Sequence, residues 1–140
     1  MQPTSIFLPA LAMVLLSAIV TFRMFFERVR QVKAEKISFR DIPSGSQMAV
    51  RFTDTRAADN YRNLFEAPVL FYLALVVAFA SAQVTALTLG LAWGYVVLRY
   101  VHSYIHCGYN RISHRLYVFL ASNVVLWLLW ALLLVGLLRG

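Results

Sequence analysis

Long apolar runs alternate with two charged blocks along this chain. Apart from Arg139, every charged side chain lies either in the block from Arg23 to Glu66 or in the block from Arg99 to Arg115. A membrane-spanning helix needs about 20 predominantly apolar residues, so the pattern predicts an all-α integral membrane protein. The uncharged runs are Ile6–Phe22, Ala67–Leu98 and Leu116–Leu138.

The middle run is too long for one span. As a single helix it would extend about 48 Å at about 1.5 Å per residue, whereas the hydrocarbon core is about 30 Å thick. A turn near Ser81, Ala82 and Gln83 divides it into two spans. We therefore expect one domain over residues 1–140, a bundle of four transmembrane helices at approximately 5–28, 60–82, 84–107 and 114–138.

Charge determines the expected topology. Lys and Arg accumulate on cytoplasmic loops, and two crossings between the charged blocks place both blocks on that side. Of the 13 Lys and Arg residues, all except Arg139 then face the cytoplasm. The net charge of +7 reflects basic loops on one side of the membrane and their contact with anionic lipids. It does not indicate nucleic-acid binding, because 61% of the residues are hydrophobic.

Cysteine usage argues against disulfides and metals. The chain has one cysteine, Cys107, which permits no intrachain disulfide. It has no Cys/His spacing of the zinc type, so we expect no metal site.

The cytoplasmic edge of the second span carries a cation, an amide and a carboxylate. Arg62, Asn63 and Glu66 would lie on neighbouring faces of one continuous helix. Glu66 would be recessed about one turn inside the span, where an ionised carboxylate is costly unless it meets a partner or a polar cavity. The simpler alternative is an intrahelical pair between Arg62 and Glu66 that only caps the span.

The third span ends with a ladder of polar side chains. Arg99, His102 and His106 lie at i, i+3 and i+7, which places them on one helical face. Snorkelling to the interface explains Arg111 and Arg115. It does not explain Arg99, which is followed by further helix and needs a polar interior or a partner such as Glu66.

These two motifs together resemble the MAPEG family (membrane-associated proteins in eicosanoid and glutathione metabolism). The matching residues are Arg62-Asn63-x-x-Glu66 in the second span and Arg99-x-x-His102 in the third. The resemblance covers nearly the whole chain, including the four spans, the long basic first loop and the Trp/Leu-rich last helix. The chain resembles bacterial-type members of the family that are similar to microsomal glutathione transferase, which implies a location in a bacterial inner (cytoplasmic) membrane.

The resemblance implies a homotrimer that holds glutathione, as cosubstrate, in a cytoplasm-facing cleft between protomers. It implies a transferase or peroxidase reaction on a lipophilic electrophile that arrives through the bilayer. His106 stands at the position where the family usually has Tyr, because Tyr104 and Tyr109 would point elsewhere on a helix. Arg111 is an alternative to Arg115 for the arginine near the sulfur. The implied binding residues are Arg28, Arg62, Asn63, Glu66, Arg99 and His102, and the implied catalytic residues are Arg115 and His106.

Two other classes stay open. A non-catalytic membrane scaffold would show the same spans. A small multidrug-type transporter has a similar length but normally carries its essential carboxylate within the first span, and Ile6–Phe22 has no acidic residue. The electrophile, and the choice between conjugation, peroxide reduction and isomerisation, cannot be read from these residues.

Overall fold

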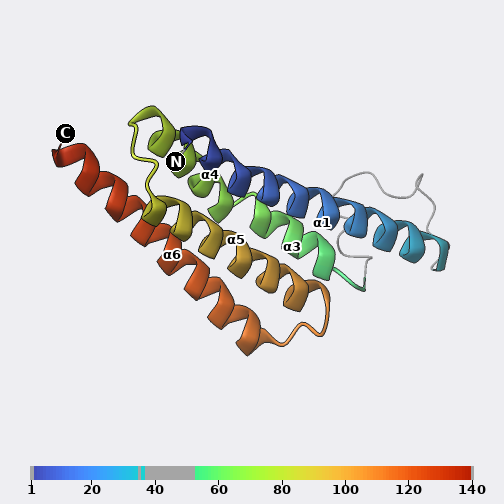
Figure 1. Cartoon of the computed structure of the whole chain (residues 1–140). Coiled ribbons are helices and arrows are strands. Elements are labelled where there is room, and N and C mark those ends of the chain that lie inside the picture. Colours follow the sequence, from blue (N-terminus) through green and yellow to red (C-terminus); the bar gives the residue numbers. More distant parts are fainter. Residues whose placement is uncertain (1, 35, 37–52, 140) are drawn as a thin grey trace.

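All regular elements of the described chain are helices (Figure 1). The computed structural model describes residues 2–34, 36 and 53–139. A short 3₁₀ helix, η1, leads into the first long helix. The elements are η1 (Pro3–Ile6), α1 (Phe7–Ala34), α3 (Arg56–Leu64), α4 (Ala67–Ala80), α5 (Ala86–Cys107) and α6 (Ile112–Arg139).

The helices form a four-span membrane bundle. Three segments are long and apolar enough to cross a bilayer, namely Pro3–Ala34, Arg56–Ala80 and Ile112–Arg139. The remaining helix, α5, has 22 residues. Its length of about 33 Å matches a hydrocarbon core of about 30 Å. Its polar side chains Arg99, His102 and His106 are buried in the bundle instead of facing lipid.

The second span is interrupted, which differs from the single helix expected over 60–82. The helix α3 ends at Leu64, Phe65 and Glu66 lie outside regular helix, and α4 begins at Ala67. Pro68 explains the position of the break. In a continuous helix its ring would clash with the carbonyl of Leu64, and it has no N–H to bond that carbonyl.

Other helix bounds depart less from expectation. The turn between α4 and α5 contains Ser81, Ala82 and Gln83, where the apolar run was expected to divide, and Ala82 adopts a left-handed φ of 56°. The helix α1 continues to Ala34, beyond the expected end near 28. Apolar patterning marks where lipid contact ends, whereas the helix itself continues through a charged stretch.

The helix α5 occupies the middle of the bundle. It packs against α1, α3 and α6, whereas α1 and α6 lie on opposite sides of the molecule (Figure 1). Side chains from α1, α4 and α6 fill the apolar interior, and large apolar side chains on the outer surface suit contact with lipid. Fully buried examples are Met13, Phe71, Ala74, Leu126, Leu129 and Leu133.

Both charged blocks meet at the same end of the bundle. The guanidinium of Arg23 donates to the carbonyl of Cys107, and that of Arg56 donates to the carbonyl of Gly108. The turn between α4 and α5 lies at the opposite end, together with the described parts of the two termini (Figure 1). An even number of crossings therefore separates the two blocks.

Candidate functional site

Arg99 lies at the centre of the polar face of α5. Its side chain has no exposed surface, and Nη2 donates a 2.8 Å hydrogen bond to the backbone carbonyl of Asn63. That carbonyl belongs to the last turn of α3, where a helix leaves its final carbonyls without intrahelical partners. The break before Pro68 therefore creates the acceptor that holds Arg99.

Glu66 was considered as an ion-pair partner for Arg99 or Arg62, and the structure shows neither pair. Among the described residues the ion pairs are Arg30–Glu27 and Arg56–Asp54. Glu66 pairs with neither Arg62 nor Arg99, and its side chain is exposed at the helix break, not recessed as expected. The expectation failed because it assumed an unbroken helix through residue 66.

Several buried polar atoms near Arg99 have no hydrogen-bond partner in this protomer. They are Nε and Nη1 of Arg99, Nε2 of His102 and the hydroxyl of Tyr95. The guanidinium lies 5.9 Å from the centre of the Phe119 ring, which shields it on the side of α6. A buried donor without a partner costs about 1–3 kcal/mol, so the two unbonded nitrogens of Arg99 are suited to an acceptor group supplied from outside the chain.

Arg115 is held by two acceptors. Its Nη1 lies 3.0 Å from Nε2 of His106 and donates to Oδ1 of Asn110 at 3.0 Å. Because arginine has only donors, Nε2 of His106 is the acceptor in this contact, and the neutral ring carries its proton on Nδ1. Nδ1 lies 3.5 Å from the side-chain amide of Asn63, which must then present its oxygen to that proton. His106 was expected to donate to a thiol in place of a family Tyr. In this protomer its Nε2 accepts from Arg115.

His102 adopts the same tautomer for a similar reason. Its Nδ1 lies 3.3 Å from the backbone carbonyl of Arg115, which can only accept. The proton is therefore on Nδ1, and Nε2 keeps its lone pair. The His102 ring stands perpendicular to that of His106, with 5.6 Å between centroids.

A hollow of about 230 Å³ brings together three of the expected site residues. Asn63, His102 and Arg115 supply polar walls from α3, α5 and α6. Apolar side chains of α6 supply the rest. The complete lining is Asn63, His102, Ile112, Arg115, Leu116 and Phe119.

The competing residues lie outside this hollow. Arg111 is exposed and is not part of the lining, so the geometry favours Arg115 over Arg111. Tyr104 and Tyr109 are 76% and 57% exposed, and Tyr109 bonds to Nδ1 of His114 at 3.1 Å. Neither tyrosine is among the residues that line the hollow.

A second, smaller hollow of about 70 Å³ lies between α1 and α3. It brings together Arg28 and Arg62, two of the three arginines expected to bind glutathione; the third, Arg99, lines neither hollow. Acidic side chains of Glu27, Asp54 and Asp59 also line it. The expected site is therefore divided within one protomer, with Asn63 and Arg62 facing different hollows. No group of three or more His, Cys, Asp or Glu side chains in the described segments is arranged to hold a metal ion.

Sequence reasoning did not select Asn110, Phe119 or Pro68 for the site. Asn110 has a left-handed φ of 49°, which asparagine tolerates better than most residues. This preference was the sequence signal that could have identified Asn110 as a turn residue. Nothing in the local sequence indicates that Phe119 covers Arg99.

The comparison with protein families agrees with this architecture. The model of the MAPEG family matches residues 6–135, nearly the whole chain. The chain belongs to the MAPEG family. Searches of curated proteins and of solved structures returned no match. MAPEG proteins include glutathione transferases and peroxidases, generally use glutathione as a substrate and are typically trimers.

Proposed function

We propose that this MAPEG protein is an enzyme that uses glutathione as cosubstrate in a transferase-type or peroxidase-type reaction on lipophilic electrophiles. The observation that carries the proposal is the hollow in which Arg115, Asn63 and His102 face the apolar side chains Leu116 and Phe119. Such a hollow suits a charged thiol compound on one wall and a molecule from the bilayer on the other. The charged end would face the cytoplasm of a bacterial inner membrane.

The charges around the site fit glutathione, which has two carboxylates, one ammonium group and a thiol. Arginine forks bind carboxylates through paired hydrogen bonds. Arg99 offers two unbonded nitrogens, but Phe119 lies over its guanidinium and would have to turn aside for a carboxylate to reach it. The amide of Asn63 can bond a peptide group, and Glu66 can accept from the ammonium.

The size of the hollow supports a site that a second protomer completes. Small-molecule pockets are typically about 300–1,000 Å³, and this one measures about 230 Å³. Glu66 is exposed at the helix break within a spanning segment, where contact with lipid would be costly for its charge. We propose a homotrimer in which the face bearing Arg28, Arg62 and Glu66 of one protomer closes the hollow of its neighbour.

Arg115 would make the thiol reactive. A free thiol has a pKa near ~8.5, and a neighbouring cation lowers that pKa and favours the thiolate nucleophile. In conjugation the sulfur bonds to carbon, and the leaving group departs with its electron pair. In peroxide reduction the thiolate takes the distal oxygen to give a sulfenic acid and, after protonation, an alcohol. A second glutathione then gives the disulfide and water.

The decisive experiment compares Arg115→Leu with Arg111→Leu in liposomes. Turnover of glutathione with an aryl halide and with a fatty-acid hydroperoxide would be measured, together with the ultraviolet thiolate band of bound glutathione. Arg115→Leu should abolish the band and turnover while leaving glutathione affinity within about tenfold, that is about 1.4 kcal/mol. Loss of the thiolate band and of turnover only in Arg111→Leu would assign the thiol-activating role to Arg111. No loss in either variant would refute the catalytic proposal and favour a scaffold.

A further inference from the structure

We infer that Arg56 is a positioning residue for Arg115, acting through the turn between α5 and α6. The inference rests on the proposed role of Arg115. Arg56 itself lines neither the larger hollow nor the smaller one. Its effect would pass through the backbone of residues 108–110.

Arg56 links the start of α3 to the end of α5. Its Nη1 donates a 2.6 Å hydrogen bond to the carbonyl of Gly108. Its Nε and Nη2 form a bidentate fork with the Asp54 carboxylate, donating to Oδ1 at 2.9 Å and to Oδ2 at 2.5 Å. Because this fork fixes the plane of the guanidinium, Nη1 stays directed at the carbonyl of Gly108.

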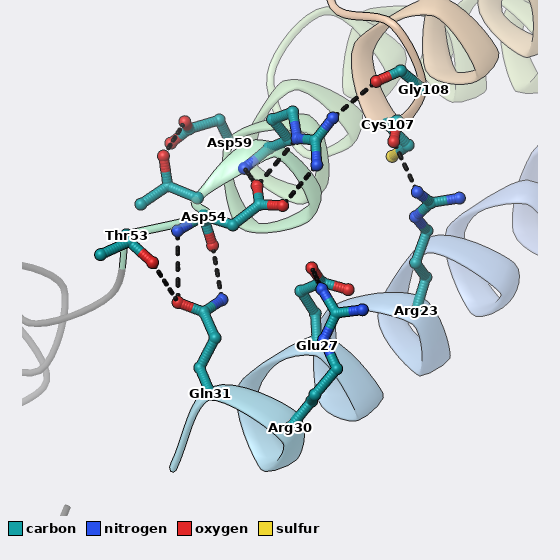
Figure 2. Close-up of polar contacts among 11 residues, drawn as sticks. Arg23, Glu27, Arg30, Gln31, Thr53, Asp54, Asp59, Cys107 and Gly108 are labelled. Carbon is teal, nitrogen blue, oxygen red and sulfur yellow. Dashed lines mark hydrogen bonds and ion pairs between the residues drawn. The ribbon is translucent and has the colours of Figure 1, made fainter. Parts of the chain in front are cut away.

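The backbone of Asp54, which carries this carboxylate, is anchored to α1. Gln31 is buried, with 7% of its surface exposed. Its Nε2 donates to the carbonyl of Asp54 at 2.9 Å, and its Oε1 accepts from the amide of Asp54 at 3.2 Å (Figure 2). Hydrogen bonds from Arg56 also hold the pKa of the Asp54 carboxyl well below its usual range. Asp54 is therefore a charged, fixed partner at neutral pH.

The turn that Arg56 holds leads directly to Arg115. Gly108 ends α5, and a Cβ at this residue would lie 2.7 Å from the carbonyl oxygen of Tyr104, so the turn is tight. Two residues later the amide of Asn110 bonds to the carbonyl of Ile105 at 2.9 Å. The side chain of Asn110 then accepts from Arg115.

A continuous path therefore runs from α1 through Asp54, Arg56 and Gly108 to Asn110 and Arg115. Without the bond from Arg56, the Gly108 carbonyl loses its side-chain partner. The bonds at Cys107, at the Gly108 amide and at the Asn110 amide remain, but the turn gains freedom. Asn110 then fixes Arg115 less firmly, and the bond from Arg115 to His106 weakens with it. The predicted consequence is an effect on His106 and on the bound thiol, not only on folding.

Nitrogen NMR of ¹⁵N-histidine-labelled protein in micelles tests this path without any ligand. In the wild type, His106 should show a single tautomer with an unprotonated Nε2. Arg56→Gln should give an averaged His106 signal, and Asp54→Asn, which keeps Arg56 but weakens the fork, should give an intermediate one. Arg30→Gln is the matched control, because Arg30 pairs with Glu27 on the same end of the protein and its side chain is 71% exposed. An unchanged His106 signal in both Arg56→Gln and Asp54→Asn would overturn the inference.

Bound glutathione supplies a second readout. At neutral pH, Arg56→Gln should lower the thiolate absorbance several-fold with little loss of glutathione affinity, whereas Arg30→Gln should not. A full thiolate band in Arg56→Gln would contradict the positioning role. Absence of the band in the wild type would refute the proposed function instead, and the ligand-free NMR comparison would still decide the role of Arg56.

Discussion

Replacing Arg99 with methionine should stabilise the free protein while removing its stabilisation by glutathione. Methionine has a similar length and no charge, so it can occupy the buried space between α3, α5 and α6. The prediction follows from the partners that Arg99 has in this protomer. It makes one hydrogen bond, to the carbonyl of Asn63, and leaves two buried nitrogens unbonded.

The expected magnitude comes from comparing these contributions. The lost bond from a charged donor is worth about 1.5–3 kcal/mol, and each unbonded buried nitrogen costs about 1–3 kcal/mol. Buried ionic groups are often replaced by hydrophobic residues with no loss or a gain of about 1–4 kcal/mol. We therefore expect Arg99→Met to raise the free energy of unfolding by about 1–3 kcal/mol. The exposed control Arg111→Met should change it by less than about 0.5 kcal/mol.

Thermal unfolding in mild detergent, with and without glutathione, measures both effects. At a glutathione concentration of about 100 times Kd, the wild type should gain about 2.7 kcal/mol. Arg99→Met should gain nothing. A fall in stability of about 3–5 kcal/mol, as when one partner of a buried ion pair is removed, would show that Arg99 has a carboxylate partner in the assembled protein. Undiminished stabilisation by glutathione would refute its role in binding.

Three further predictions concern charge and assembly. Glu66→Gln should weaken glutathione binding more than Glu35→Gln, because Glu66 is exposed within a span whereas Glu35 belongs to the first charged block of the sequence; equal effects in a binding titration would contradict this. The pKa of Asp54 is lowered by its bond to Arg56, so its contribution to stability is present above pH ~3.9 and is lost as pH falls below that value. The difference in thermal stability between wild type and Asp54→Asn should therefore shrink on acidification, and a constant difference from neutral to acidic pH would argue against the ion pair. Native mass spectrometry in mild detergent should show a trimer, and a uniform monomer would argue against the shared site.

Run lengths and helical periodicity were enough to predict four spans and the grouping of Arg99 with His102. An apolar run longer than the hydrocarbon core must turn, and it does so near Ser81–Gln83. Residues at i and i+3 share a helical face in any packing arrangement. These features depend only on local geometry and on bilayer thickness.

Other features depend on contacts between distant segments and could not be read from local patterns. The bond between Arg56 and Gly108 joins residues 52 positions apart. The role of His106 as an acceptor depends on Arg115, which lies on a different helix. The break at Phe65 and Glu66 was missed for another reason. Pro68 lies inside an apolar run, and hydropathy does not register the carbonyl clash that a proline causes.

Calorimetric titration of the detergent-solubilised protein with glutathione and with its S-hexyl derivative tests the central claim most directly. The claim is that one site joins a glutathione-binding wall to an apolar wall formed by Leu116 and Phe119. Both compounds should bind saturably, and the hexyl chain should tighten binding at least about tenfold, since each buried CH₂ contributes about 0.8 kcal/mol. No saturable heat with either compound would contradict the account.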